Sequence, residues 1–172
     1  GIGGGHFPHA ARSNFNLTYI LLDNSIYGLT KGQVSPTSPM GMKSGTSPYG
    51  NIARPLNPTT LALAYGATFV ARTFSRERDM VSDLITRAIQ HKGFSFIHDL
   101  SPCVVFNKDV TYGSVNSVTA QLPEEHDILD RSNAMSLAES TEPVYQGLFF
   151  QEKIPSFDDH VKQVKDGLNK SD

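Results

Sequence analysis

Residues 17–33 read LTYILLDNSIYGLTKGQ, and the order of residue types in this stretch sets the expected architecture. Its first part, residues 17–22, is nearly continuous in apolar character, which is typical of a strand covered on both faces of a parallel sheet. The chain turns polar at Asp23 and reaches a glycine at Gly28. Ligands of open α/β sheets gather at the carboxyl ends of strands, so we expect a binding loop to begin here.

Helical and strand patterns alternate on both sides of this stretch. We expect further strands at residues 68–74 and 94–100, and helices at residues 6–14, 58–65, 77–91 and 156–168. The helix at 77–91 carries apolar residues at spacings of three and four, and Gly93 ends it. Residues 122–151 show little periodicity, and the acidic part of that stretch, residues 124–130, is expected to be a solvated loop. The alternation predicts a three-layer α/β fold around a mostly parallel sheet.

Composition excludes several classes of partner. The chain has 172 residues, and 15 Lys and Arg against 17 Asp and Glu give a net charge of −2, so we expect no nucleic-acid partner. No apolar run approaches the roughly 20 residues that a bilayer crossing needs, so we expect no membrane association. We find no signal-peptide pattern, and Cys103 is the only cysteine, which favours a reducing cytoplasm.

The segment after the strand carries the donors that a metal-bound diphosphate requires. Asn24 offers a side-chain oxygen and the carbonyl two residues later offers another, which suits Mg²⁺. Gly28 has no Cβ, so a phosphate can approach the main chain, and the amides of residues 28–30 with the Thr30 hydroxyl can bind anionic oxygens. Taken alone, however, an Asn before Tyr-Gly is most often only a turn, and both interpretations stay open at this point.

Other candidates also have plain structural interpretations. Cys103 alone is more often a small buried hydrophobic residue than a ligand. His6 and His9 lack a third ligand with suitable spacing, so packing or capping is favoured for both. His98 is expected at a sheet or subunit surface. Lys31 is typical of a solvated loop charge, although a contact to a substrate carboxylate or a phosphate is the alternative hypothesis.

The stretch LDNSIYGLTKGQVSPTSP resembles the thiamine-diphosphate-binding loop in the β subunits of 2-oxoacid:ferredoxin oxidoreductases, the group that includes the 2-oxoglutarate enzyme. The segments IGGGHFPHAARSN, TSPYGN, RPLNPTTLALAYGATFVAR and SPCVVFN are similar to that family too, in the same order. The resemblance implies a partial thiamine-diphosphate-binding domain at residues 1–120 and a carboxyl-terminal extension with a terminal helix at residues 121–172.

The resemblance also implies roles for particular residues, none of them directly catalytic. These are Asn24 (side chain) and Ile26 (carbonyl) as magnesium ligands, Gly28, Leu29 and Thr30 as contacts to the diphosphate, His6 in the cofactor pocket, and Cys103 as the last of four cysteines that hold a 4Fe-4S iron-sulfur cluster. The glutamate that activates the cofactor is expected from a companion α subunit.

The activity that the resemblance implies is oxidative decarboxylation of a 2-oxoacid, with 2-oxoglutarate favoured, to an acyl-coenzyme A, with ferredoxin as the electron acceptor. The expected assembly is an oligomer. The other cluster cysteines and a Gly-Asp-Gly magnesium ligand precede residue 1 in the family, and Gly5 stands where relatives commonly have Asn. Because the sequence opens with GIGGG, we expect a fragment that begins inside a glycine-rich turn, is incomplete at its amino end and is inactive alone.

Two alternatives stay open. The first is another thiamine-diphosphate enzyme, such as a decarboxylase or a transketolase-like enzyme, although Cys103 and the TKGQ segment weigh against it. The second is a non-catalytic module that only docks a partner subunit.

Overall fold

The protein is built around a five-stranded sheet with the strand order β1-β3-β2-β5-β4, in a computed structural model that describes residues 4–168. Three neighbouring strands run parallel, namely β1 (Leu17–Asp23), β3 (Phe94–Leu100) and β2 (Phe69–Phe74). β5 (Val144–Gln151) pairs antiparallel with β2, and β4 (Thr119–Gln121) pairs parallel with β5. The expected strands at 68–74 and 94–100 are therefore confirmed.

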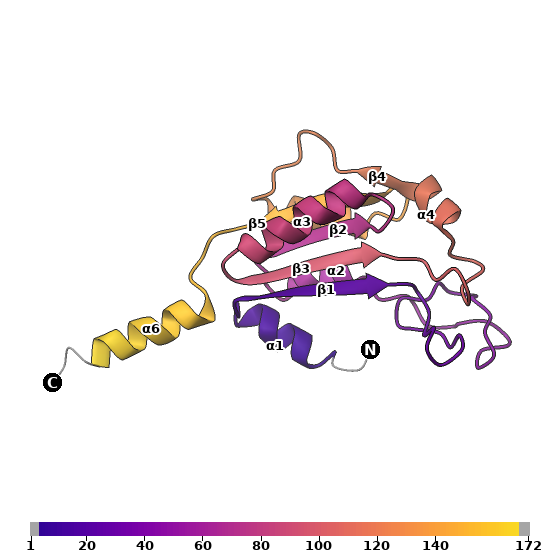
Figure 1. Cartoon of the computed structure of the whole chain (residues 1–172), viewed down its shortest axis with the longest axis horizontal. Coiled ribbons are helices and arrows are strands. Elements are labelled where there is room, and N and C mark those ends of the chain that lie inside the picture. The colour runs from indigo at the N-terminus through magenta and orange to yellow at the C-terminus, as the bar shows by residue number, and fades with distance from the viewer. Residues whose placement is uncertain (1–3, 169–172) are drawn as a thin grey trace.

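Helices cover both faces of this sheet, as Figure 1 shows. α3 (Arg78–Gln90) packs on one face through Leu84 and Ala88. α1 (His6–Arg12), α2 (Pro58–Ala64) and α5 (Arg131–Glu139) pack on the other face, around a separate apolar cluster. Successive strand residues point to opposite faces, since Phe69 packs with the α3 side chains while Val70 packs with the apolar cluster on the other face. The three-layer α/β fold is confirmed.

The strand at residues 17–22 is confirmed, but the expectation that it is covered on both faces is wrong. β1 is the terminal strand of the sheet and pairs only with β3 within the described residues. Leu22 is 68% exposed, and Leu17, Tyr19 and Ile20 are also exposed. The apolar run therefore belongs to an edge strand with one neighbour. Its exposed side chains form an apolar surface along that edge of the sheet.

The stretch with little periodicity contains regular structure that the sequence did not reveal. α5 and β5 lie within residues 122–151, and α4 (Tyr112–Val118) and β4 come directly before this stretch and were not expected either. β5 pairs antiparallel with β2 through an irregularity between Val70 and Ala71, so residues on both sides of position 120 belong to one sheet.

α6 (Phe157–Leu168) follows as expected, yet none of its residues is buried, and it projects from the body in Figure 1. Phe157 at its start contacts the Phe15 ring, with centroids 4.5 Å apart, whereas Val164 further along is 63% exposed. No helix among residues 4–168 combines the length and the apolar character that a membrane crossing would require.

Asn14 joins several elements at the amino ends of the strands. It adopts a left-handed backbone conformation with φ of 52°. Its side-chain oxygen accepts hydrogen bonds from the Phe94 amide at 2.8 Å and the Thr68 hydroxyl at 2.9 Å. Its side-chain nitrogen donates to the Pro155 carbonyl at 3.0 Å. This one residue therefore connects the end of α1, the starts of β2 and β3, and the approach to α6.

We expect Gly93→Ala to destabilise the protein by about 3 kcal/mol or more, because strain and lost hydrogen bonds add. A Cβ at Gly93 would lie 2.5 Å from the Asn14 side-chain oxygen and 2.7 Å from the Thr68 hydroxyl, at a φ of +131°. Gly66→Ala is the matched control, since Gly66 also has a positive φ but no atom within 4 Å of such a Cβ. The control should cost about 1–2 kcal/mol. Equal losses in urea unfolding would contradict this account.

Candidate functional site

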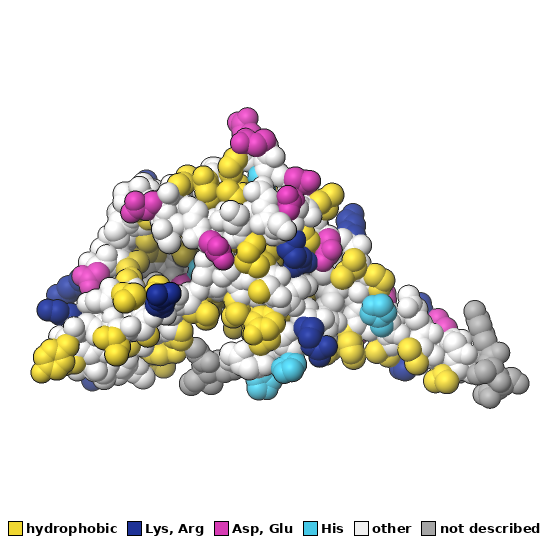
Figure 2. All heavy atoms as spheres, turned by 180° about the vertical axis from the view of Figure 1, so that it is seen from behind, with side chains coloured by type: hydrophobic (Ala, Val, Ile, Leu, Met, Phe, Trp, Pro, Cys, Tyr) yellow, Lys and Arg dark blue, Asp and Glu magenta, His cyan; other side chains and the backbone are white. Residues whose placement is uncertain are grey.

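A cavity of about 740 Å³ opens at the carboxyl end of β1. This volume lies within the range of small-molecule sites. Its deeper wall is apolar and comes from α1, β1, β3 and α2, and polar groups from the segment after β1 line one end. Figure 2 shows hydrophobic side chains around a hollow on the side of the molecule away from α6. The wall residues are Phe7, Tyr19, Leu21, Leu61 and Phe96, and the polar end includes Asp23, Asn24, Thr30 and Thr37.

The first turn of this segment contains two oxygens that have room for a further ligand. The Asn24 side-chain oxygen accepts a hydrogen bond from the Ile26 amide at 3.1 Å, and Ser25 between them has a φ of 55°. The Asn107 side chain donates to the Asn24 carbonyl at 3.1 Å and fixes the turn from outside. Within residues 4–168 the Ile26 carbonyl accepts no hydrogen bond. The Asn24 oxygen retains a lone pair, so both oxygens can bind a hard cation.

The next turn presents free amides. Its ends are joined because the Tyr27 amide donates to the Gln33 carbonyl at 2.8 Å and the Gly32 amide donates to the Tyr27 carbonyl at 2.9 Å. In the described part of the chain, the amides of residues 28–30 donate no hydrogen bond. The Thr30 hydroxyl contacts the Gln33 side-chain oxygen, and the Leu29 side chain is fully exposed. Consecutive free amides of this kind can bind an anion.

Cys103 lies beside the same turns. A Cβ placed on Gly28 would be 3.8 Å from the Cys103 sulfur, from the Asn24 side-chain nitrogen and from the Phe106 ring. The Phe106 amide donates to the sulfur at 3.4 Å. Hydrogen bonds from the amides of Phe106, Val105 and Asn107 lower the pKa of the Cys103 thiol, and a thiolate is the form that binds metals. Within residues 4–168 no group of three or more His, Cys, Asp or Glu side chains could hold a metal ion, so Cys103 belongs to no such group there.

A buried polar chain runs from the start of the segment into the core. The Asp23 carboxylate pairs with His98 Nε2 at 3.0 Å, and His98 Nδ1 lies 3.1 Å from the Thr59 hydroxyl. Arg72 Nε donates to that hydroxyl at 3.2 Å. Asp23 comes from β1, His98 from β3, Thr59 from α2 and Arg72 from β2. This chain therefore ties the cavity to three further elements.

Burial and pairing shift the pKa values of these groups. Burial lowers the pKa of His98, despite the opposing hydrogen bond and charge of Asp23. Burial alone would raise the pKa of Asp23, but hydrogen bonds from His98, Thr37 and the Ser25 amide outweigh burial and lower that pKa, as does the charge that His98 carries when it is protonated at lower pH. Burial lowers the pKa of Arg72 to about 10. Near neutral pH this series of hydrogen bonds therefore links the charged Arg72 guanidinium to the charged Asp23 carboxylate through the neutral side chains of Thr59 and His98.

Comparison with known proteins identifies the family. The family model described as thiamine pyrophosphate enzyme, C-terminal TPP binding domain, matches residues 1–98. The chain belongs to this family. A second family model, which describes the carboxyl-terminal part of the pyruvate ferredoxin oxidoreductase beta subunit, matches residues 103–166. Thiamine pyrophosphate is another name for thiamine diphosphate, so the expected type of cofactor-binding domain is confirmed.

The relatives are subunits of larger enzymes. The 2-oxoglutarate synthase subunit KorB of Methanocaldococcus jannaschii is 36% identical, over 97% of this chain and 62% of that subunit. The 2-oxoglutarate oxidoreductase subunit KorB of Mycobacterium tuberculosis is 41% identical, over 72% of this chain and 32% of that subunit. These matches confirm the resemblance to the β subunits of 2-oxoacid:ferredoxin oxidoreductases.

A solved structure gives the same result. The 2-oxoglutarate:ferredoxin oxidoreductase of Magnetococcus marinus, with 2-oxoglutarate, coenzyme A and succinyl-CoA bound, superimposes with a TM-score of 0.95 at 41% identity. The superposition covers 98% of this chain and 58% of that chain. The chain therefore spans less than two thirds of the length of each of these relatives.

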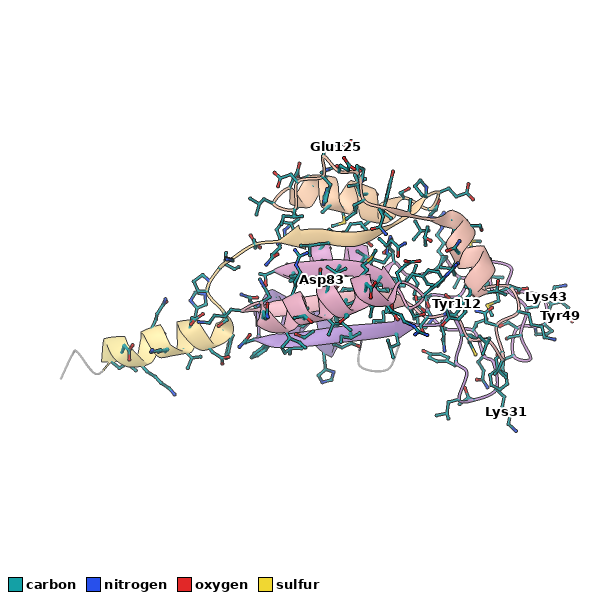
Figure 3. The ribbon with its side chains drawn as sticks, turned by 45° about the horizontal axis from the view of Figure 1, so that its top comes forward. Lys31, Lys43, Tyr49, Asp83, Tyr112 and Glu125 are labelled. Carbon is teal, nitrogen blue, oxygen red and sulfur yellow. The ribbon has the colours of Figure 1, made fainter. Side chains whose placement is uncertain are left out.

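The thiamine pyrophosphate domain brings most of the predicted residues together. Asn24, Ile26 and residues 28–30 line the cavity, and Cys103 lies beside Gly28. His6 is exposed on the first turn of α1 and does not line the cavity, whereas Gly4 and Phe7 do. Lys31, Lys43 and Tyr49 extend outward at the rim of the loop segment, away from the strands (Figure 3).

The expectation that His98 lies at a sheet or subunit surface is wrong. His98 is only 4% exposed, because α2 packs over the carboxyl end of β3 and places Thr59 against the imidazole. Sequence reasoning also missed the structural roles of Asp23, Thr59 and Arg72. One signal was available, since Asp23 ends one strand and His98 approaches the end of another, which brings both to the same edge of the sheet.

We expect the stability of the domain to fall with acidification partly because of His98. A pKa that is lower in the folded than in the unfolded protein means that the unfolded chain binds more protons below about pH 6.5, so the free energy of unfolding falls as the pH drops. Between about pH 7.5 and 5.5 the native protein should lose about 1 kcal/mol more than His98→Gln, which cannot titrate. Urea unfolding at both pH values measures this difference. His91, whose pKa is also lowered by burial, is present in both proteins. Equal pH dependence would contradict the assignment of a neutral His98.

Proposed function

We propose that this chain is part of the β subunit of a 2-oxoacid:ferredoxin oxidoreductase and that its cavity binds thiamine diphosphate with Mg²⁺. The observation that carries the proposal is the placement of free backbone amides at residues 28–30 next to the available oxygens of Asn24 and Ile26. One set of groups suits an anion and the other suits a cation. A magnesium diphosphate needs both at adjacent positions.

The cavity supports specific roles for its residues. Asn24 Oδ1 and the Ile26 carbonyl would hold the metal, the amides of residues 28–30 with the Thr30 hydroxyl would hold the diphosphate, and the apolar wall would enclose the rings of the cofactor. When bound, the cofactor supplies the electron-sink chemistry that decarboxylation of a 2-oxoacid needs. The residues of this chain bind it, orient it and exclude water. We propose no directly catalytic residue here, and the activating glutamate would come from a companion α subunit.

The proposed reaction is oxidative decarboxylation of a 2-oxoacid to an acyl-coenzyme A, with ferredoxin as the acceptor. The ligands named for the Magnetococcus marinus enzyme support 2-oxoglutarate and coenzyme A. Cys103 beside Gly28 would supply one thiolate to a 4Fe-4S cluster next to the cofactor, and its lowered pKa supports that role. A decarboxylase or a transketolase needs no such thiolate, so Cys103 favours the oxidoreductase. Lys31 at the rim would contact a substrate carboxylate or a phosphate.

We further propose that the chain works within a cytoplasmic assembly and binds the cofactor weakly alone. Both Asp23 carboxylate oxygens already accept hydrogen bonds, so this residue offers no free carboxylate to Mg²⁺. Exposed apolar side chains beside the cavity and along β1, such as Leu22, Leu29 and Val104, support contact with further protein. The expected magnesium aspartate and the remaining cluster cysteines would come from the rest of the enzyme.

Asn24→Ala in the complete subunit should weaken the binding of thiamine diphosphate in the presence of Mg²⁺ by about tenfold or more. A tenfold loss corresponds to about 1.4 kcal/mol of binding free energy. The reason is the loss of one of the two oxygens that this turn offers to the metal. Isothermal titration calorimetry gives the dissociation constant. Asn116→Ala, on the exposed surface of α4, is the control and should bind normally. An unchanged constant for Asn24→Ala would remove this residue from the site.

Gly28→Ala separates binding from stability. Its Cβ would make only ordinary contacts at 3.8 Å, so the free energy of unfolding should change by less than about 1 kcal/mol. The same methyl group would occupy the path of a phosphate to the free amides, so cofactor affinity should fall by about tenfold or more. Gly113→Ala, whose nearest contact would be 3.7 Å, is the matched control. Normal affinity in Gly28→Ala would place the diphosphate elsewhere.

A further inference from the structure

We infer that His98, Thr59 and Arg72 are positioning residues for the cofactor loop, and that they act through a one-way chain of hydrogen bonds that ends on Asp23. This inference rests on the proposed function, because it assigns these residues to the turn that would present Asn24 and Ile26 to Mg²⁺. None of the three side chains lines the cavity. Their effect on the cofactor would therefore be indirect.

The chemistry of the end groups fixes the direction of the chain. A guanidinium only donates, so the Thr59 oxygen accepts from Arg72 Nε. An ionised carboxylate only accepts, so His98 Nε2 carries the ring proton and donates to Asp23. His98 is neutral near pH 7 because burial lowers its pKa, so Nδ1 is unprotonated and accepts from the Thr59 hydroxyl. Each hydrogen points toward Asp23, and chains aligned in this way polarise one another.

Asp23 connects these hydrogen bonds to the turn that follows β1. Its other carboxylate oxygen accepts from the Ser25 amide at 2.9 Å and from the Thr37 hydroxyl at 2.6 Å. Ser25 has a left-handed backbone and stands between Asn24 and Ile26, and its carbonyl accepts from the Ser38 hydroxyl at 2.6 Å. A non-glycine residue in this conformation needs surrounding contacts that hold it there. The carboxylate therefore braces the residue that sets the separation of the two proposed ligands.

Arg72 anchors the opposite end of the chain. Its terminal nitrogens donate to the Tyr145 carbonyl at 3.1 Å, to the Asn57 side-chain oxygen at 3.2 Å and to the Ala138 carbonyl at 3.1 Å. Its guanidinium also lies over the Phe149 ring at 5.2 Å. These partners come from α5, β5 and the start of α2 and fix the guanidinium on several sides. The series of hydrogen bonds from Arg72 to Asp23 therefore couples the position of these core groups to that of the proposed cofactor loop.

The test uses paired variants in the complete subunit, with thiamine diphosphate and Mg²⁺ as the probes. His98→Leu removes both ring nitrogens and should weaken cofactor affinity and raise the half-saturating Mg²⁺ concentration by about tenfold or more, as loss of a group that orients a metal ligand does. His98→Gln keeps an N–H that can donate to Asp23 and should stay within about threefold of the native protein. Thr59→Val should weaken binding by about threefold or more, and Thr59→Ser should not, because the serine hydroxyl preserves the link.

His91→Leu is the matched control. His91 is also buried and bonds the Thr68 hydroxyl at 2.8 Å, but at the amino end of the strands. The His91→Leu variant should lower the urea midpoint, as we also expect for His98→Leu. It should leave cofactor affinity within about twofold of the native value. Normal binding by His98→Leu, equal losses in His98→Leu and His91→Leu, or no rescue by His98→Gln would each overturn the inference.

The second pair and the native protein complete the test. If His98→Leu does not fold, equal affinities of Thr59→Val and Thr59→Ser overturn the inference. If the native subunit does not bind thiamine diphosphate, the proposed function fails and this inference fails with it. If the native subunit binds and the variants bind equally well, only the inference fails.

Discussion

The buried carboxylate of Asp23 is the constraint that organises this molecule around its cavity. It sits at the last residue of β1, where a regular strand changes into an irregular segment. An ionised carboxylate that is largely removed from water is costly unless donors surround it. Here a backbone amide, a hydroxyl and an imidazole supply those donors. Stabilising this charge therefore also fixes the turn that follows it.

The same constraint explains why the cavity can be polar at one end and apolar elsewhere. Asp23 and Thr37 satisfy each other, and within residues 4–168 the Ile26 carbonyl and the amides of residues 28–30 make no hydrogen bond, while the Asn24 side-chain oxygen accepts only one. The remaining wall is formed by side chains of α1, β1, β3 and α2 that belong to or adjoin the core. A preformed cavity that is mostly apolar, with a few polar groups at one end, is a usual arrangement for a small-molecule site.

The sequence predicted the parts of the site that arise from neighbouring residues. A strand, an Asp, an Asn and a loop glycine follow one another within a short stretch of sequence. The turn and its candidate ligands could therefore be placed from the sequence alone. The position of His98 could not, because its burial depends on α2, whose Thr59 is 39 residues away in the chain. The elements within residues 122–151, and α4 and β4 directly before them, were missed for a similar reason. β4 has only three residues, and β5 is recognisable mainly from its antiparallel pairing with β2.

The contacts of Arg72 bear on how the two matched regions of the chain relate to each other. Arg72 lies on β2, within residues 1–98, and donates to carbonyls of Ala138 and Tyr145, within residues 103–166. Without those carbonyls a buried guanidinium would lose part of its hydrogen bonding, which costs free energy. Cys103 lies just beyond β3, close to Gly28. The later region therefore completes the polar core beneath the loop that follows β1, and strands from both matched regions belong to one sheet.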